Sequence, residues 1–281
     1  MKSLSFAAAA VLCLLSGSAA ASSLFAVQFP GATPFFEVDQ ASGALATISA
    51  NVGTPDIGDL TSDTRPGSGT IWGINIPDNE LLTIDSTTGL VSGSVILDTD
   101  GITSLAFDPV SGRLFGNSTP AFGNGLMDDE LFEINPATGA TNSIGIIDRF
   151  ANIFALGFDQ SGRLFGVSDV SDELLEISTA TGAGNAVGAV LDDTGAAVSS
   201  MFDIASRPED DTMFLVSSGT ASLYTLNTST ATASLVGPYS PASTNLVGLA
   251  FLPVPEPGSI GLLLLGGLGF VLVGGLSRAC A

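Results

Sequence analysis

The chain has 281 residues, of which 45% are hydrophobic and 12% charged, and 28 acidic against 7 basic residues give a net charge of −21. A phosphate backbone and anionic lipid headgroups bind cationic surfaces, so we expect neither nucleic acid nor an acidic lipid surface as a partner. The chain has no histidine, which excludes His-based catalytic triads, His general bases and the commonest zinc ligand sets.

The N-terminus has the three parts of a secretory signal peptide. Lys2 is followed by an apolar run over residues 4–15 and then by small residues that end at Ala21. An apolar run of about 12 residues is too short to cross the hydrocarbon core as a helix. Ala19 and Ala21 occupy the positions that signal peptidase requires. We therefore expect residues 1–21 to be a signal peptide that is cleaved after Ala21.

A nine-residue sequence motif recurs along the body of the chain. Its four full copies each begin with a strand-forming run and end in glycine, at residues 35–43, 81–89, 131–139 and 174–182. Polar residues after the strand and a terminal Gly predict a turn in which the glycine adopts positive φ. A fifth copy, from Leu223 to Asn227, keeps the strand and lacks the glycine.

A second sequence motif precedes the nine-residue motif in each unit and predicts a β-hairpin. It is clearest at residues 105–116 and 156–166, where two apolar runs flank a tight turn that contains glycine. A short apolar stretch after each glycine turn, such as 143–147 or 186–190, adds a further strand. Four-stranded units at this spacing predict a β-propeller, because one such sheet buries its two faces only when neighbours stack on it.

The two ends of the body predict that the ring is closed. Residues 24–27 have the pattern of the second strand of a unit, and residues 246–251 form a first strand without a unit of its own. Joined, the two segments complete one blade, while the other blades begin near Ile57, Ile102, Ile153 and Met201. We therefore expect an all-β, five-bladed propeller of four-stranded antiparallel sheets over residues 22–253. An open β-solenoid has shorter coils, and a sandwich does not repeat in this way.

The C-terminus contains one segment long enough to cross a membrane. Residues 258–277 carry no charge, and at 1.5 Å per residue a helix of this length spans about 30 Å. Glu256 lies before the segment and Arg278 after it, which places the body outside the cytoplasm by the positive-inside rule. A permanent anchor and a segment handled by a processing enzyme are both compatible with this pattern.

Residues 254–281 resemble the PEP-CTERM sorting signal of Gram-negative bacteria that make extracellular polysaccharide. Pro255, Glu256 and Pro257 match the motif, and Arg278 stands where the family usually carries a cluster of basic residues. The resemblance covers about a tenth of the chain and does not extend to the body. It implies recognition by an exosortase, export through the inner membrane, and a place in the membrane and then at the cell surface or in the extracellular matrix.

Several side chains of the body are candidate ligands. Asp108 and Asp159 follow equivalent strands, where they either bind calcium or open the tight turns in which aspartate is favoured. Residues 98–101 resemble the start of an EF-type loop without its later ligands. Arg113 and Arg163 occupy the same place in two units and either pair with acidic glycans or stabilise a hairpin. Acidic clusters that fit solvated turns lie at residues 128–130, 169–173 and 209–211.

Three functions are compatible with this sequence. The favoured one is a non-catalytic surface or matrix protein, an interaction or structural module associated with exopolysaccharide, for which we predict no catalytic residue and no cofactor. The second is a glycan-binding propeller, with calcium as an optional ligand. The third is a hydrolase or lyase that uses paired carboxylates and a metal, and clustered carboxylates around the central channel are the feature that it requires.

Overall fold

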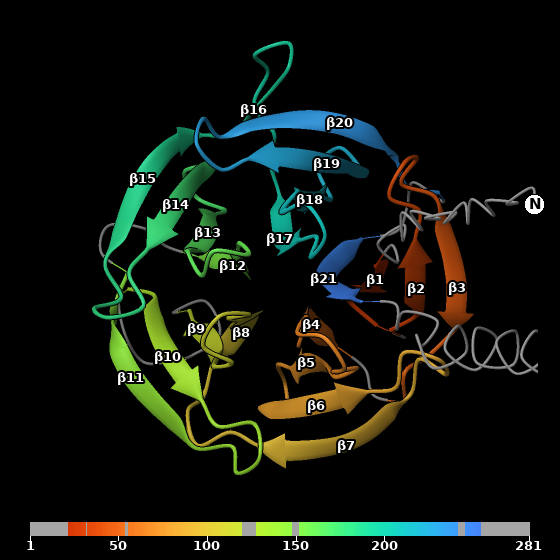
Figure 1. Ribbon diagram of the computed structural model, residues 1–281, viewed down its shortest axis with the longest axis vertical. Helices are drawn as coiled ribbons and strands as arrows, with labels where there is room; N and C mark the ends of the chain where they lie inside the picture. Colours follow the sequence, from red (N-terminus) through yellow and green to blue (C-terminus); the bar gives the residue numbers. More distant parts are fainter. Residues whose placement is uncertain are drawn as a thin grey trace, which may run out of the picture. The chain divides into compact units, whose positions relative to one another are not determined.

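The computed structural model describes residues 22–31, 33–53, 56–119, 128–147, 152–240 and 245–253. These residues belong to one compact unit, Ser22–Pro255. They form five sheets arranged around a central axis (Figure 1). The predicted all-β, five-bladed propeller is therefore confirmed. Within the described ranges, no helix has the length and apolar character needed to cross a membrane, and the predicted span 258–277 lies outside them.

Each blade is a meander that runs from an inner strand at the axis to an outer strand at the rim. The inner strands are β4 (Ile57–Ser62), β8 (Ile102–Phe107), β12 (Ile153–Phe158), β17 (Met201–Ser206) and β21 (Leu246–Leu252). The second strands are β5 (Ile71–Asn75), β9 (Leu114–Ser118), β13 (Leu164–Ser168), β18 (Met213–Ser217) and β1 (Ser23–Gln28). The inner strands begin at the residues that the sequence repeats predicted.

The third and outer strands complete the meander. The third strands are β6 (Glu80–Ile84), β10 (Glu130–Ile134), β14 (Glu173–Ile177), β19 (Ser222–Asn227) and β2 (Phe35–Val38). The outer strands are β7 (Val91–Ile96), β11 (Thr141–Ile146), β15 (Gly184–Ala189), β20 (Thr232–Pro238) and β3 (Leu45–Ser49). Every pairing of a third with an outer strand contains a β-bulge, which bends the rim strand and increases its twist.

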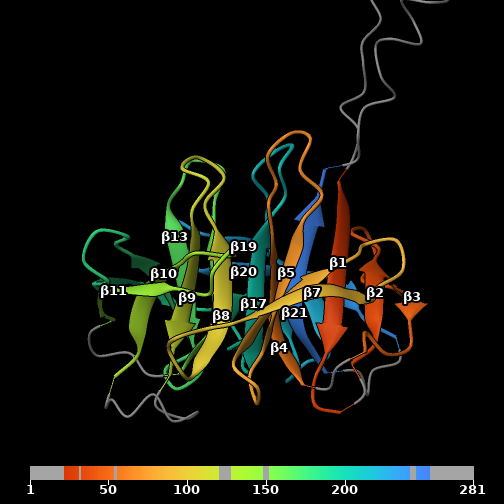
Figure 2. The same cartoon turned by 90° about the horizontal axis from the view of Figure 1, so that it is seen from below.

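The ring is closed by the two ends of the propeller. β21 pairs antiparallel with β1, in a register that places Ser23 opposite Leu252 and Leu24 opposite Phe251. The predicted closure is confirmed. Ser22 and Pro253 consequently lie at the face that carries the hairpins between inner and second strands, at the top of Figure 2. We call this the hairpin face, and we call the opposite face, where the chain passes from blade to blade, the crossover face.

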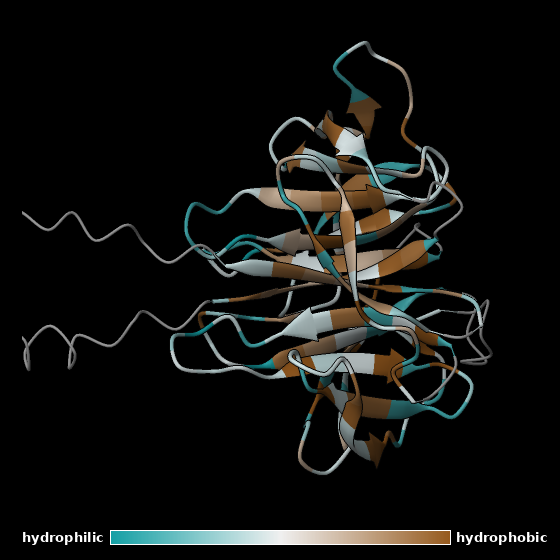
Figure 3. Cartoon of the chain, turned by 90° about the vertical axis from the view of Figure 1, so that its right-hand side faces the viewer, coloured by the Kyte–Doolittle hydropathy of each residue, from teal (hydrophilic) through white to brown (hydrophobic). Residues whose placement is uncertain are grey.

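The core lies between neighbouring blades. Every residue of β8 and β9 is buried, because adjacent sheets cover both faces of these strands. The second strands carry an aromatic ring at the same position in all five blades, namely Phe25, Trp72, Phe115, Phe165 and Phe214. Hydrophobic residues accordingly concentrate in the strands, while the loops at both faces are largely hydrophilic (Figure 3).

One blade departs from the predicted four strands. A short strand, β16 (Leu191–Asp192), pairs parallel with β20 and makes this sheet five-stranded. The Asp192 carboxylate accepts hydrogen bonds from the backbone N–H groups of Thr194 and Ala196, at 2.8 and 2.9 Å, and so forms a tight turn. This turn holds Leu191 beside the rim, where its N–H donates to the carbonyl of Ala231. The repeat spacing contained no signal for this addition.

The glycine turns of the repeat make the junctions between blades at the rim. Gly139 has φ +75°, and a Cβ at this residue would lie 2.0 Å from the carbonyl oxygen of Ile96 on the preceding blade. Gly182 contacts the preceding blade in the same way, with a Cβ position 2.3 Å from the carbonyl oxygen of Gly145. In the fifth unit the turn is kept by Ala231, at φ 56°. The fifth unit therefore keeps the turn although it lacks the glycine.

Candidate functional site

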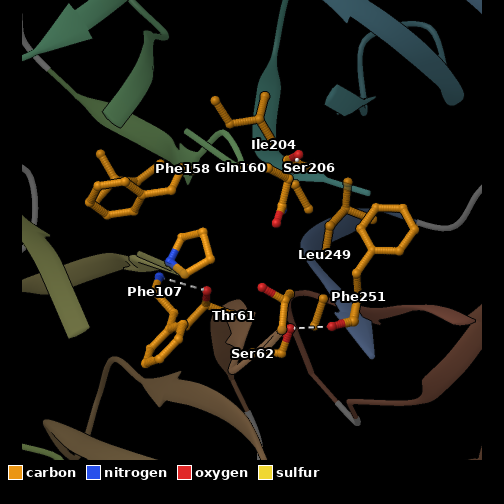
Figure 4. A pocket seen from close by; sticks show the side chains of 15 residues that line it. Thr61, Ser62, Phe107, Phe158, Gln160, Ile204, Ser206, Leu249 and Phe251 are labelled. Atoms are coloured by element: carbon orange, nitrogen blue, oxygen red, sulfur yellow. Dashed lines mark hydrogen bonds between the residues drawn. The ribbon is translucent and has the colours of Figure 1, made fainter. Parts of the chain in front are cut away.

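A small hollow lies where the inner strands meet at the hairpin face. The centres of water molecules have about 30 Å³ of space within it, which is enough to hold at least one water. Side chains from all five inner strands surround it (Figure 4). The Thr61 hydroxyl accepts a hydrogen bond from the Phe107 N–H at 3.1 Å, and the Ser62 hydroxyl donates to the Phe251 carbonyl at 2.5 Å. Both hydrogen bonds join neighbouring blades, so the hollow lies at a seam between blades.

Two aspartates occupy equivalent positions deeper in the ring. Asp59 is the third residue of β4 and Asp203 the third residue of β17, and both are fully buried. Each carboxyl accepts the N–H of the residue that follows it, Leu60 at 2.8 Å and Ile204 at 2.7 Å. These interactions bind one oxygen of each carboxyl to its own strand.

The second oxygen of each carboxyl reaches the next blade. Asp59 accepts the N–H of Leu105 at 2.6 Å, and Asp203 accepts the N–H of Leu249 at 2.5 Å. Inner strands are sheet edges, whose N–H groups toward the axis have no partner strand. The two aspartates satisfy such groups, and each thereby ties its blade to the following one.

The two carboxyls also lie close enough to influence each other's ionisation. Burial raises the pKa of Asp59 well above its ordinary value. Burial, and then the neighbouring charge of Asp59, raise the pKa of Asp203. Two ionised carboxylates in a dry site repel each other, which favours the protonated form of one of them. Gly248 occupies the equivalent position on β21, where a Cβ would lie 2.6 Å from the Leu60 backbone nitrogen.

This carboxyl pair is the clustered arrangement that a carboxylate enzyme would need. Its surroundings favour a different role, since neither side chain is exposed and each oxygen accepts a backbone N–H. A group held in this way neither contacts a substrate nor exchanges protons with it in this conformation. The geometry thus supports a structural role, in which each carboxyl links its blade to the following one.

Asp108 and Asp159 each serve their own hairpin. The Asp108 carboxylate accepts the Val110 N–H at 2.8 Å and the Ser111 hydroxyl at 2.5 Å. Asp159 accepts the Ser161 N–H at 3.0 Å and binds the Arg163 guanidinium at 2.7 Å. These contacts match the turn interpretation. In the part of the chain that the structure describes, no group of three or more His, Cys, Asp or Glu side chains could hold a metal ion.

The two candidate arginines pair with carboxylates of the protein itself. Arg113 donates to Glu133 at 2.7 Å and lies 4.8 Å from the ring centre of Phe115. Arg163, paired with Asp159, lies 5.1 Å from the ring centre of Phe165. The same arrangement recurs at Arg65, with Asp63 and Phe107, and at Arg207, with Asp210 and Phe214. The hairpin interpretation of these arginines therefore accounts for their contacts.

The segment at residues 98–101 also makes contacts within the protein. Hydrogen bonds from the Thr141 hydroxyl and the Thr141 N–H lower the pKa of Asp98, and they join one blade to the next. Asp100 accepts the Asn79 side-chain amide at 3.1 Å. The geometry is that of a junction between blades.

The structure does not test the predicted processing residues. Ala19 and Ala21, and the sorting-signal residues Pro255, Glu256, Pro257 and Arg278, lie outside the described residues. The aspartates that meet at the axis were missed by the sequence analysis. A signal was present, because Asp59 and Asp203 are single charges at the third position of otherwise uncharged inner strands.

No protein-family model matches this chain, and its sequence matches no curated protein. A chain in the crystal structure of a nidogen/laminin complex superposes with a TM-score of 0.55 at 11% identity, over 84% of this chain and 99% of that one. Likeness at this identity supports a shared propeller fold and carries no activity with it.

Weaker likenesses involve enzymes. A glutaminyl cyclase from Myxococcus xanthus superposes with a TM-score of 0.46 at 13% identity, over 69% of each chain. A catalytically inactive virginiamycin B lyase from Staphylococcus aureus superposes with a TM-score of 0.44 at 13% identity, over 79% of this chain and 72% of that one.

Proposed function

We propose that this protein is an exported, non-catalytic interaction module of the cell surface or extracellular matrix, processed through its C-terminal sorting segment. The proposal rests on the resemblance of Pro255, Glu256 and Pro257, with the uncharged stretch that follows them, to a sorting signal. It agrees with the burial of Asp59 and Asp203, whose carboxyls already accept hydrogen bonds from backbone N–H groups.

The position of the chain ends in the fold carries the proposal further. Ser23 pairs with Leu252 on the hairpin face, and the sorting segment begins shortly after Pro253. The crossover face lies opposite these two residues, and we propose it as the face that binds partners. Turns of that face carry Asp78, Asp169 and Asp172, which makes an exopolysaccharide of neutral sugars a better partner than a polyanion.

Cell fractionation tests the sorting role. Wild type is compared with a chain that lacks residues 254–281 and with a variant in which Pro255, Glu256 and Pro257 are replaced by alanine. We expect both variants to shift from the surface fraction to the medium or the periplasm. The exposed Glu176→Ala serves as a control for loss of one carboxylate and should fractionate normally. Unchanged fractionation of both altered chains would contradict the proposal.

Glycan binding with calcium is the second candidate, and one feature of the crossover face favours it. Burial and the nearby charge of Asp172 raise the pKa of Asp169, so a divalent cation beside the two carboxylates would relieve their repulsion. A glycan array run in calcium and again in chelator tests it. Binding that requires calcium and is lost in Asp169→Asn supports this function, and an array without any bound glycan refutes it.

A further inference from the structure

The first residue of the propeller makes contacts that link two blades. Ser22 is 3% exposed. Its backbone N–H donates to Oε1 of Glu209, and its hydroxyl donates to Oε2 of the same carboxylate at 2.8 Å. Its carbonyl accepts the side-chain amide of Gln40 at 2.6 Å. Every polar group of Ser22 therefore has a partner from a distant part of the chain.

These partners belong to two neighbouring blades, the blade that closes the ring and the blade before it. Glu209 lies in the hairpin between β17 and β18, and Gln40 follows β2 in the blade that β1 and β21 complete. Arg207 connects the two, since it donates to the Gln40 side chain at 3.0 Å and binds Asp210 at 2.6 Å. Ser22 is thus the point at which the closing blade is fastened to its neighbour.

We infer that removal of the signal peptide turns this contact into an ion pair, in which the new α-ammonium group of Ser22 binds the Glu209 carboxylate and clamps the closed ring. The inference rests on the proposed export of the protein. In the uncut chain, the Ser22 nitrogen is a neutral amide with one N–H. Hydrolysis of the Ala21–Ser22 bond adds water, leaves a carboxylate on Ala21, and leaves an amine on Ser22 that takes up a proton at neutral pH.

The chemistry of the site suits such a change. An α-ammonium group has three donors and a pKa of about 7.7–8.0, and hydrogen bonds between ionised groups are roughly twice as strong as neutral ones. The charged groups around Ser22 are Glu209, Asp210, Arg207 and Glu37, the last through the Ser23 hydroxyl. Arg207 is already bound to Asp210 through two nitrogens, so the Glu209 carboxylate remains the partner nearest to the Ser22 nitrogen.

Thermal unfolding of three purified forms tests the clamp. One form begins at a free Ser22, one is the same chain with an acetylated α-amino group, and one retains Ala20 and Ala21. Each is made with Glu209 and with Glu209→Gln. At pH 7 we expect the free form to melt about 2–4 °C above the other two when Glu209 is present. In Glu209→Gln this difference in melting temperature should be less than a third as large.

Two further comparisons make the result specific. Glu176→Gln, an exposed carboxylate remote from Ser22, should leave the difference between the forms unchanged. Pairing raises the pKa of the α-ammonium group, so its stabilisation is complete below about pH 7.7 and is lost as the pH rises through the raised value. An equal difference in wild type and Glu209→Gln, or one that persists at pH 11, would overturn the inference.

Failure of the clamp is distinguishable from failure of export. The melting comparison uses N-termini made in vitro, so it does not depend on processing in the cell. The mass of the protein recovered from the exporting organism separately reports whether cleavage follows Ala21. A mature chain that begins elsewhere would remove the biological basis of the clamp, whatever the melting data show.

Discussion

Replacing Gly139 by alanine tests how the blades are joined at the rim. Two costs are expected. The residue has φ +75°, a conformation that costs an L-residue about 1–2 kcal/mol. The added Cβ would also lie 2.0 Å from the Ile96 carbonyl oxygen, whereas ordinary contact begins at 3.4 Å. The turn must therefore move away from the preceding blade by more than 1 Å.

This movement disturbs a defined set of contacts. The Asp98 N–H donates to the Gly139 carbonyl at 3.2 Å, and the Asp98 carboxylate accepts the Thr141 N–H at 2.9 Å. Forced overpacking costs about 1–3 kcal/mol, so the two effects together should lower the free energy of unfolding by about 2–5 kcal/mol. For a domain of this size, we expect a loss of roughly 5–15 °C in Tm.

A matched glycine separates the two costs. Gly195 has φ +83° and no atom within 4 Å of its Cβ position, so Gly195→Ala should show only the backbone cost, about 1–2 kcal/mol. Urea unfolding followed by circular dichroism measures both variants and the wild type. If Gly139→Ala lost no more stability than Gly195→Ala, the close contact between blades would be unimportant and the reasoning would be wrong.

Three other changes probe the axis and the hairpin face. Burial raises the pKa values of Asp59 and Asp203 in the folded protein. Their contribution to the free energy of unfolding is therefore complete below the pKa of an unfolded aspartate, about 3.9, and declines as the pH rises through the raised pKa values of the folded protein. Asp203→Asn should flatten this decline in urea titrations at a series of pH values, and an unaltered slope would contradict the raised pKa values. Leu249→Ala, at a buried position of the closing strand, should cost about 2–5 kcal/mol in the same assay, and a loss below 1 kcal/mol would show that β21 contributes little to closure. Arg163→Ala should cost less than about 1 kcal/mol, because the side chain is 46% exposed, and a loss above 2 kcal/mol would reveal a cooperative network.

The repeats determined the architecture because they record local chemistry. Apolar runs that start at Ile57, Ile102, Ile153 and Met201 became the inner strands, since each must be buried between two neighbours. The separated end strands, joined at Leu24 and Phe251, were predictable because neither completes a blade alone. Turn chemistry likewise assigned Asp108 and Asp159 to their hairpins, as one of two alternatives.

The contacts between blades could not be predicted in this way. Asp59 and Asp203 are separated by most of the ring in sequence, and only the closed geometry brings their carboxyls into one dry site, where the charge of Asp59 raises the pKa of Asp203. The attachment of β16 to β20 and the meeting of Ser22 with Glu209 also depend on where the ring closes. A sequence determines which residues form a blade because strands and turns obey short-range rules. Partners across the ring were decided by the tertiary structure, because their distance depends on the number, tilt and stacking of all the blades.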